Sequence, residues 1–281
     1  MYMYVYFEPC GGINDILVNI NKILLYCNIH NRILLVNAYK SLYKINFIDY
    51  FNLPKNNIII DTEKIKAIFN NTNYTIYPEV LKNKMNDILN NKIIFNWTPD
   101  KGLFAYNGLK LHLPKENRPE TIIVHSGCGG GHGYTLFKKL IFNINIKNIC
   151  KERYNRLKNP YLCIQIRNTD YKCDYISYFN ENNSIIRSFA EIYIATDDKK
   201  VLEFYKNKGL PIKNFATFPE NDEYGNLHGS NVDSHTKFID LLCDIYIIGM
   251  SDTLLSNSNG GFINLVRDIN ANKQKLIKQF L

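Results

Sequence analysis

Three apolar segments in the second half of the chain each end in residues that could bind a phosphate group. Segment 161–166 leads to Arg167 and Asp170, segment 191–196 leads to two adjacent aspartates, and segment 253–255 leads to a serine- and glycine-rich loop. Such runs are typical of buried parallel strands, whose carboxyl ends meet at the edge where open α/β sheets bind ligands. An arginine there offers a forked donor to phosphate, and a loop entering a helix offers backbone N–H groups. The three strand ends predict a nucleotide-diphosphate site.

In this order, the segments resemble the GDP-fucose-dependent fucosyltransferases, the superfamily of the α1,6-, α1,2- and protein O-fucosyltransferases. The first motif of that family reads roughly H-x-R-R-T-D. Arg167, Thr169 and Asp170 match it. Gln165 stands in place of the histidine, and Asn168 stands in place of the second arginine.

Other stretches extend the resemblance. Residues 11–15 are similar to the family's N-terminal G-G-x-G-D/N loop, and residues 195–198 are similar to its A-T-D-D strand end. Asp244 stands at the position of the family's helix aspartate. Residues 251–252 are similar to its S-x-A-D motif, and residues 256–262 are similar to its serine-rich loop. Within the first of them, Asn14 replaces a glycine. The resemblance covers roughly the first thirty residues and then 161–266, and it leaves 40–150 uncovered.

The resemblance implies a role for each of these residues. Arg167 would stabilise the charge that develops on the diphosphate leaving group. Asp244 would accept hydrogen bonds from the adjacent N–H groups of guanine. The serine-rich loop would bind the phosphates through its backbone N–H groups and hydroxyls. The implied nucleotide-sugar site consists of Gly11, Gly12, Asn14, Gln165, Arg167, Asp197, Asp198, Asp244, Ser256, Ser258, Asn259, Gly260, Gly261 and Phe262.

Each assignment has a plainer alternative. Arg167 could be a surface arginine at a strand end, and Asp244 could be a solvated helix residue. Ser256 to Phe262 could form an ordinary strand-to-helix turn. Asp197 and Asp198 could orient the hydroxyls of ribose or fucose, or one of them could cap the helix expected from about residue 199.

The general base that would take the proton of the acceptor hydroxyl has three candidates. Asp170 and Asp174 follow the arginine strand, where the family places a motif acid and then a carboxylate base, although Asp174 is off that register by one residue. Asp15 follows the N-terminal glycines and could face the active site from the first half of the chain. An equally good explanation of Asp15 is a favourable interaction with the helix dipole.

Composition excludes several other classes of protein. A hydrophobic fraction of 46% excludes a disordered chain, and the net charge of +8 is spread without a block of lysine and arginine, which disfavours nucleic-acid binding. The glycine-dense loop 127–133 lacks the P-loop pattern. His125 and His132 flank this loop and could line the acceptor side or be structural. No cluster of histidine, cysteine and carboxylate suggests a metal, and the family's donor site requires none.

The seven cysteines are widely spaced, without a C-x-x-C pair. The N-terminus is a poor signal peptide, and no apolar run is long enough for a membrane span. We therefore expect a cytoplasmic protein with reduced cysteines.

The order of apolar segments predicts an α/β fold with two Rossmann-like domains that face a cleft, the GT-B type. We place an acceptor-side domain at 1–155 and a nucleotide-sugar-binding domain at 156–281. In the first, a strand over 2–7, a helix from near residue 14 and a strand over 32–36 form one β-loop-α-β unit. In the second, strands are expected at 161–167, 191–196, 213–217 and 253–255, with a helix over 234–248.

The hypothesis from the sequence is an inverting, metal-independent glycosyltransferase that moves L-fucose from GDP-β-L-fucose to a glycan hydroxyl. Two alternatives remain open. One is a transferase of the same fold that uses another nucleotide sugar, because Gln165 and Asn168 depart from the family motif. The other is an inactive glycan- or nucleotide-binding protein of the same fold.

Overall fold

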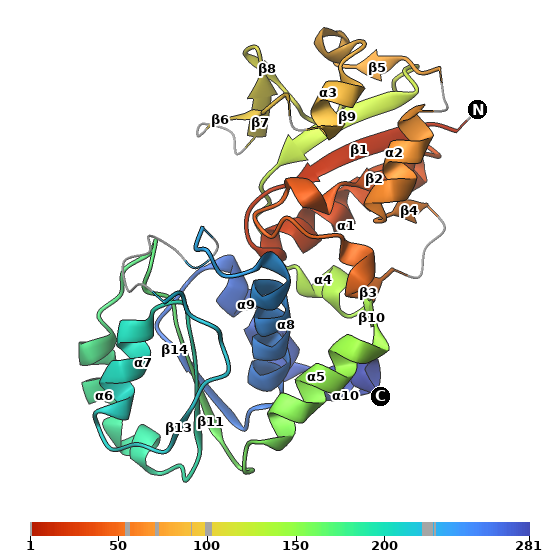
Figure 1. Cartoon of the computed structure of the whole chain (residues 1–281). Coiled ribbons are helices and arrows are strands. Elements are labelled where there is room, and N and C mark those ends of the chain that lie inside the picture. The colour runs from red at the N-terminus through yellow and green to blue at the C-terminus, as the bar shows by residue number, and fades with distance from the viewer. Residues whose placement is uncertain are drawn as a thin grey trace. The chain divides into compact units, whose positions relative to one another are not determined.

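The structure is a computed structural model that describes residues 2–53, 57–70, 73–90, 92–98, 103–220, 227 and 229–281. The chain divides into two compact units, Met1–Ile141 and Phe142–Leu281 (Figure 1). Helix α5 (Ile144–Asn155) belongs to the second unit, whereas the predicted boundary placed it in the first. The assignment of an acceptor side and a donor side to the two halves stays a prediction.

The first unit is built on a sheet whose centre is parallel. Strand β1 (Tyr4–Pro9) pairs with β2 (Ile33–Val36) on one side and β9 (Ile122–Gly127) on the other, and the sheet order is β4-β2-β1-β9-β7-β6. β5 also pairs with β9, and β8 with β7. The other strands of this unit are β3 (Phe51–Asn52), β4 (Ile58–Ile59), β5 (Ile76–Tyr77), β6 (Asn96–Thr98), β7 (Leu103–Tyr106) and β8 (Leu109–Lys110), and β10 (Ile141–Phe142) lies at the boundary.

Helix α1 (Ile13–Ile29) packs on β1 and β2 and confirms the predicted β-loop-α-β unit. Its apolar residues at three- and four-residue steps are buried: Ile16, Leu17, Ile20, Ile23, Leu24 and Cys27. Because side chains alternate along a strand, Tyr4 and Tyr6 of β1 point to one face. There they join a core with residues of α2 (Thr62–Asn70) and α3 (Met85–Leu89). The short helix α4 (Tyr134–Phe137) contacts α1.

The second unit has a four-stranded parallel sheet with the order β13-β12-β11-β14. Its strands are β11 (Leu162–Ile166), β12 (Ile192–Thr196), β13 (Ile212–Lys213) and β14 (Thr253–Ser256), and its remaining helices are α6 (Tyr175–Arg187), α7 (Lys199–Lys206), α8 (Ser234–Met250), α9 (Gly261–Ala271) and α10 (Lys273–Phe280). The strands predicted at 161–167, 191–196 and 253–255 and the helix predicted at 234–248 are thereby confirmed, whereas the strand predicted at 213–217 overlaps β13 only at Lys213. β13 ends earlier than predicted, at Lys213, and the Asn214 side chain instead donates to the carbonyl of Ile194.

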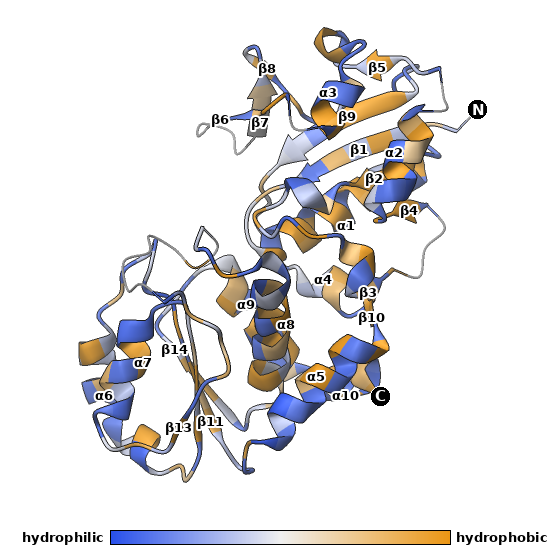
Figure 2. Ribbon diagram, in the orientation of Figure 1, coloured by the Kyte–Doolittle hydropathy of each residue, from blue (hydrophilic) through white to orange (hydrophobic). Residues whose placement is uncertain are grey.

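The order of the second sheet explains why three distant segments come together. β11 lies between β12 and β14, so the residues that follow these strands emerge side by side at one edge. Apolar residues of β11, β12, α6 and α7 form the core under that edge. In Figure 2, α6 and α7 carry both hydrophobic and hydrophilic residues, as expected of helices that cover one face of a sheet.

A disulfide joins Cys10 and Cys128 in the first unit, with Cα atoms 5.4 Å apart. The register of β1 and β9 pairs Pro9 with Gly127, which are the last residues of the two strands. Cys10 and Cys128, the residues that follow them, therefore lie opposite each other. The prediction that all cysteines are reduced is wrong at this pair, because strand register placed together two cysteines that are 118 positions apart. Disulfides persist mainly in oxidising compartments, and the cytoplasmic location stays a prediction.

None of the helices in the described ranges is both long and apolar enough to cross a membrane.

Candidate functional site

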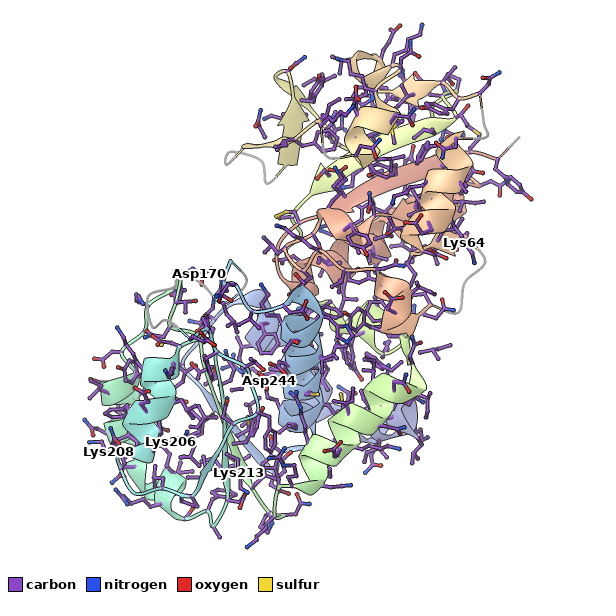
Figure 3. All side chains as sticks on the ribbon, viewed as in Figure 1. Lys64, Asp170, Lys206, Lys208, Lys213 and Asp244 are labelled. Carbon is purple, nitrogen blue, oxygen red and sulfur yellow. A yellow bond between two sulfur atoms is a disulfide. The ribbon has the colours of Figure 1, made fainter. Side chains whose placement is uncertain are left out.

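Arg167 emerges directly after β11 and forms a two-contact ion pair with Asp170. Its Nε lies 2.8 Å from Asp170 Oδ1, and its Nη2 lies 2.5 Å from Asp170 Oδ2. The arginine side chain is 42% exposed. Asp170, labelled in Figure 3, therefore holds one edge of the guanidinium plane and fixes the direction of the other.

The other edge of this guanidinium faces the start of helix α9. A Cβ atom on Gly260 would lie 3.5 Å from Arg167 Nη1. Gly260 is the N-cap residue of α9 and provides no side-chain cap. The first N–H groups of a helix have no partner within the helix, and its N-terminus carries a partial positive charge. Arg167 and the α9 N-terminus thus converge on an electropositive position suited to an anion.

The serine-rich loop is tied to β11 by hydrogen bonds. The Arg167 backbone N–H donates to Ser258 Oγ (3.3 Å), and the Ser256 hydroxyl donates to Gln165 Oε1 (2.7 Å). The backbone N–H of Ser258 in turn donates to Ser256 Oγ (3.1 Å). Asn259 is exposed, whereas Gly261 and Phe262 are half-buried in the first turn of α9. The structure therefore brings the predicted residues of β11, β14 and this loop together.

Both aspartates of the A-T-D-D strand end hold the loop that follows Arg167. Asp197 accepts from the Asn168 backbone N–H (2.7 Å) and from the Thr169 hydroxyl (2.6 Å). Asp198 accepts from the Asn168 side chain (2.8 Å) and from the Lys200 backbone N–H (2.9 Å). Asp198 is the N-cap of α7, which confirms the capping alternative for this residue. These bonds position the Arg167–Asp170 pair.

Asp174 is the N-cap of α6. Its Oδ1 accepts from the Ser177 backbone N–H (2.9 Å), and its Oδ2 accepts from the Ser177 hydroxyl (2.7 Å). These hydrogen bonds hold the pKa of Asp174 below its usual value. A carboxylate with a lowered pKa is a weaker base, so this geometry suits a capping role.

Asp244 lies on α8 in the interior of the second unit and keeps part of its surface accessible (Figure 3). Its Oδ1 accepts from the Tyr193 hydroxyl at 2.5 Å. Burial raises the pKa of Asp244 to about 7, although the Tyr193 hydrogen bond lowers it. One turn earlier, Asp240 pairs with Arg153 of α5 at 2.7 Å, and the Phe215 ring lies 5.6 Å from that of Tyr193. The solvated-helix alternative for Asp244 is therefore wrong.

The predicted residues of the N-terminal loop gather in the first unit. Gly11 has a φ of +78°, and a Cβ atom there would lie 2.7 Å from Asp15 Oδ2, so this position requires glycine. Gly12 is the N-cap of α1. The Asn14 side chain donates to the Gly131 carbonyl (3.1 Å) and accepts from the Gly133 N–H (2.9 Å), which ties α1 to the second glycine loop.

Comparison with known proteins bears on the fold. No protein-family model and no curated protein sequence matches the chain. Fucosyltransferase NodZ from Bradyrhizobium is 14% identical with a TM-score of 0.63, over 95% of this chain and 93% of that chain. NodZ α1,6-fucosyltransferase co-crystallised with GDP is 13% identical with a TM-score of 0.64, over 95% and 92%. POFUT1 in complex with GDP-fucose is 13% identical with a TM-score of 0.55, over 95% and 94%.

The chain has the fold of these fucosyltransferases. The predicted resemblance is confirmed at the level of the fold, and so is the predicted α/β class with parallel sheets. On this fold, the electropositive position beside Arg167 lies at the carboxyl edge of the second sheet.

Glu8 is a candidate functional residue that the sequence reasoning missed. It is the penultimate residue of β1, is 8% exposed, and accepts a hydrogen bond from the Tyr6 hydroxyl at 3.0 Å. Burial raises the pKa of Glu8 to about 7, although Lys40 and the Tyr6 hydrogen bond lower it. A single carboxylate inside an otherwise apolar strand was the signal in the sequence.

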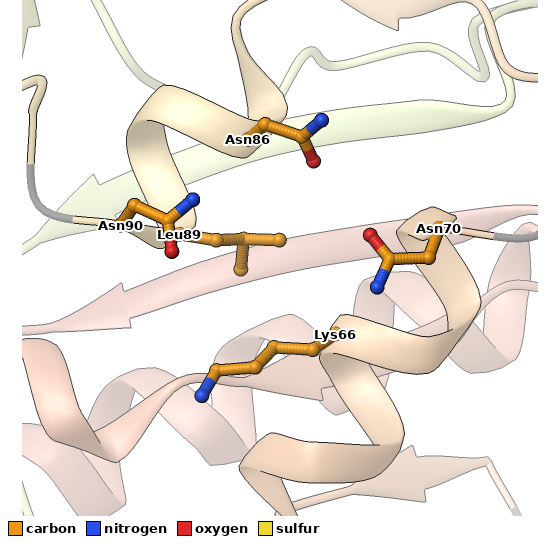
Figure 4. Close-up of a pocket in the computed structure, with 5 residues that line it drawn as sticks. All are labelled: Lys66, Asn70, Asn86, Leu89 and Asn90. Carbon is orange, nitrogen blue, oxygen red and sulfur yellow. The ribbon is translucent and has the colours of Figure 1, made fainter.

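Two other features of the first unit have a structural explanation or no assigned role. His125 is buried, hydrogen-bonds the Leu111 carbonyl through Nδ1 (2.9 Å) and stacks on Phe7. Burial lowers the pKa of His125 to about 4, so the ring is neutral at physiological pH. A pocket of about 230 Å³ between α2 and α3 contains none of the predicted site residues (Figure 4). Its lining consists of Lys66, Asn70, Asn86, Leu89 and Asn90.

Proposed function

We propose that this protein is an inverting glycosyltransferase that transfers L-fucose from GDP-β-L-fucose to a hydroxyl group of a glycan. In this proposal two Rossmann-like domains face a cleft in the GT-B manner. Residues 156–281 bind the donor, and residues 1–155 bind the acceptor. The neighbour NodZ is described as an α1,6-fucosyltransferase, and an α-linked product from a β-linked donor requires inversion.

The observation that carries the proposal is the position of Arg167 beside the N-terminus of α9. Departure of GDP places negative charge on the β-phosphate. Arg167 Nη1, the N–H groups after Gly260 and the hydroxyls of Ser256 and Ser258 lie at the sheet edge where such a group would bind. Fixed donors of this kind stabilise developing charge without reorganisation. Because the protein supplies this charge itself, we propose that the reaction needs no metal.

Asp244 is the proposed reader of the guanine base. Guanine presents adjacent N–H groups, and an ionised carboxylate can accept hydrogen bonds from both. Tyr193 already donates to Asp244, and the half-buried ring of Phe215 lies beside Tyr193. In this proposal the Asp244 carboxylate is the acceptor for the purine, and the Phe215 ring, which Arg156 contacts at 4.6 Å, is an aromatic surface near Tyr193.

Titration calorimetry with GDP, UDP and ADP tests the donor assignment. We expect GDP to bind most tightly. Incubation of the protein with GDP-fucose and a glycan array, read by mass spectrometry, then tests the transfer. Tighter binding of UDP would favour a different nucleotide sugar, the alternative that Gln165 and Asn168 keep open. No binding of any nucleotide would favour an inactive protein of this fold.

A further inference from the structure

The carboxyl ends of β1 and β2 contain a buried polar cluster that the donor site does not use. Tyr6 donates to Glu8 Oε1 at 3.0 Å, and Asn37 Nδ2 donates to the Tyr6 hydroxyl at 2.9 Å. Lys40 Nζ, at the end of the short 3₁₀ helix η1 (Ala38–Lys40), lies 3.9 Å from the same Glu8 oxygen. All four side chains lie within the first unit: Tyr6 and Glu8 are in β1, and Asn37 and Lys40 follow its parallel neighbour β2.

This cluster has hydrogen-bonding capacity that the described residues do not use. Asn37 is 2% exposed, and its Oδ1 atom is buried with no hydrogen-bond partner in the described part of the chain. An unsatisfied buried acceptor is costly, and each one in a folded protein calls for an explanation. The side chains of Lys40 and Glu8 keep 10% and 11% of their surface exposed, so the cluster is not fully sealed from solvent.

The chemistry of the cluster matches a sugar hydroxyl. A hydroxyl can donate one hydrogen bond to Asn37 Oδ1 or Glu8 and accept one from the Lys40 ammonium. An apolar ligand would leave Asn37 Oδ1 without a hydrogen-bond donor, and an anion would be repelled by the carboxylate of Glu8. The carboxyl edge of a parallel sheet is also where ligands of α/β proteins bind.

We propose that Glu8, Asn37 and Lys40 form the acceptor-sugar subsite and that Glu8 is the general base, an inference that rests on the proposed glycosyl transfer. In that step the acceptor oxygen bonds to the anomeric carbon of fucose, and the bond from that carbon to the β-phosphate oxygen of GDP breaks. GDP leaves with the electron pair of the broken bond. The proton of the acceptor hydroxyl passes to the Glu8 carboxylate.

Two of the three candidates from the sequence, Asp170 and Asp174, are engaged elsewhere. Asp170 binds the guanidinium of Arg167, and Asp174 caps α6. Glu8, in contrast, has its pKa raised to about 7 by burial, and a base whose pKa lies near the working pH is the most effective.

Burial shifts the pKa values of the groups around Glu8 as well, and it moves those of Tyr6 and His125 away from neutral pH. The pKa of Tyr6 is raised well above its usual value by burial, and the pKa of Lys40 is lowered, also by burial. His125 on β9, paired in register with Phe7, stays neutral because burial lowers its pKa to about 4. Asn37, which follows β2, does not titrate.

Glu8→Gln tests the proton transfer. Glutamine keeps the size of the side chain and can still accept from Tyr6, but it cannot take a proton. We expect kcat to fall roughly 100-fold or more, within the usual range for a lost general base, and the limb of the kcat–pH profile near pH 7 to disappear. The affinity for GDP should not change. The matched control is Glu79→Gln, an exposed glutamate of the same unit. Transfer by Glu8→Gln at the wild-type rate, with GDP bound normally, would overturn this inference and leave the proposed function standing.

Sugar binding can be tested without any turnover. Saturation-transfer NMR with methyl β-galactoside and methyl N-acetyl-β-glucosaminide should show transfer from the wild-type protein to at least one of them. Lys40→Met, which keeps the apolar stem, should weaken the signal several-fold, whereas the exposed control Lys82→Met should not. If the wild type binds neither glycoside, or if Lys40→Met binds as the wild type does, the subsite is refuted whether or not GDP binds.

Discussion

Asp170 holds two of the three nitrogens of the Arg167 guanidinium, Nε at 2.8 Å and Nη2 at 2.5 Å. The acid therefore orients the arginine, and Nη1 is the nitrogen that faces Gly260 at the start of α9. This orientation matters because the Arg167 side chain is half-exposed. Asp170 restricts its rotamers before a phosphate binds, so binding costs less conformational entropy.

Replacement of Arg167 should remove most of the transfer activity. Arg167→Ala should lower kcat about 100- to 1,000-fold, as the loss of a single electrostatic stabiliser does in other enzymes. Arg167→Lys should recover little of this, because a point charge cannot keep the two contacts with Asp170 and also face Gly260. Asp170→Asn should weaken GDP binding less than Arg167→Ala does. Rates near wild type for the alanine variant would remove Arg167 from the mechanism.

Asp244 should release a proton when GDP binds. In the unliganded protein burial raises the pKa of Asp244 to about 7, and guanine N–H donors would favour the ionised form and lower that pKa. Calorimetry at pH 7 in buffers of different ionisation enthalpy should therefore show release of about half a proton. In Asp244→Asn the release should vanish, and the affinity for GDP should fall about tenfold or more. An unaltered affinity would place the base elsewhere.

Metal chelation should leave the reaction intact. Arg167 and the N-terminus of α9 would meet the charge of the diphosphate. Initial rates of transfer with and without EDTA should therefore agree. A rate that depends on added manganese or magnesium contradicts this mechanism.

Glu8 should make the first unit less stable as the pH rises. Its folded pKa of about 7 lies above its ordinary value of 4.5, so the folded state binds the extra proton, and this stability is lost between pH 4.5 and 7. The shift corresponds to roughly 3 kcal/mol at most. His125 acts in the opposite direction, because its pKa is lowered to about 4.

The difference in unfolding free energy between the wild type and Glu8→Gln isolates the contribution of Glu8, because the contribution of His125 is the same in both proteins. The two proteins should have similar unfolding free energies at pH 4, and the variant should be the more stable one at pH 8. Urea unfolding can be followed through Trp97, the single tryptophan, which lies in β6 of the first unit. A difference that does not vary with pH would show that Glu8 titrates normally.

Reduction of the Cys10–Cys128 disulfide should destabilise the first unit. The bond closes a long loop, and such cross-links typically contribute about 2–4 kcal/mol. Both cysteines are half-buried and within reach of dithiothreitol. The midpoint of urea unfolding should fall on reduction. The double variant Cys10→Ser, Cys128→Ser should begin at the lower midpoint and show no response to the reductant.

Local patterns in the sequence determined which segments form helices and strands. They also determined which strands are followed by residues that could bind a phosphate group. The pattern of apolar residues predicted α1 and α8, and short apolar runs predicted β11, β12 and β14. The predicted end of β11 placed Arg167 at the carboxyl edge of the sheet, where the structure has it. These features depend on neighbours within about one turn or one strand, and such neighbours are visible in the sequence itself.

Only the tertiary structure decided what each polar group touches. Strand register placed Cys10 opposite Cys128, and the pairing of β2 with β1 brought Lys40, which follows β2, to Glu8. The position of α8 in the second unit put Asp244 against Tyr193. Each of these contacts joins residues tens of positions apart, and the burial that shifts the pKa of Glu8 or Asp244 exists only once the layers have packed. Sequence pattern carries the periodicity of an element, but not the identity of its partners in space.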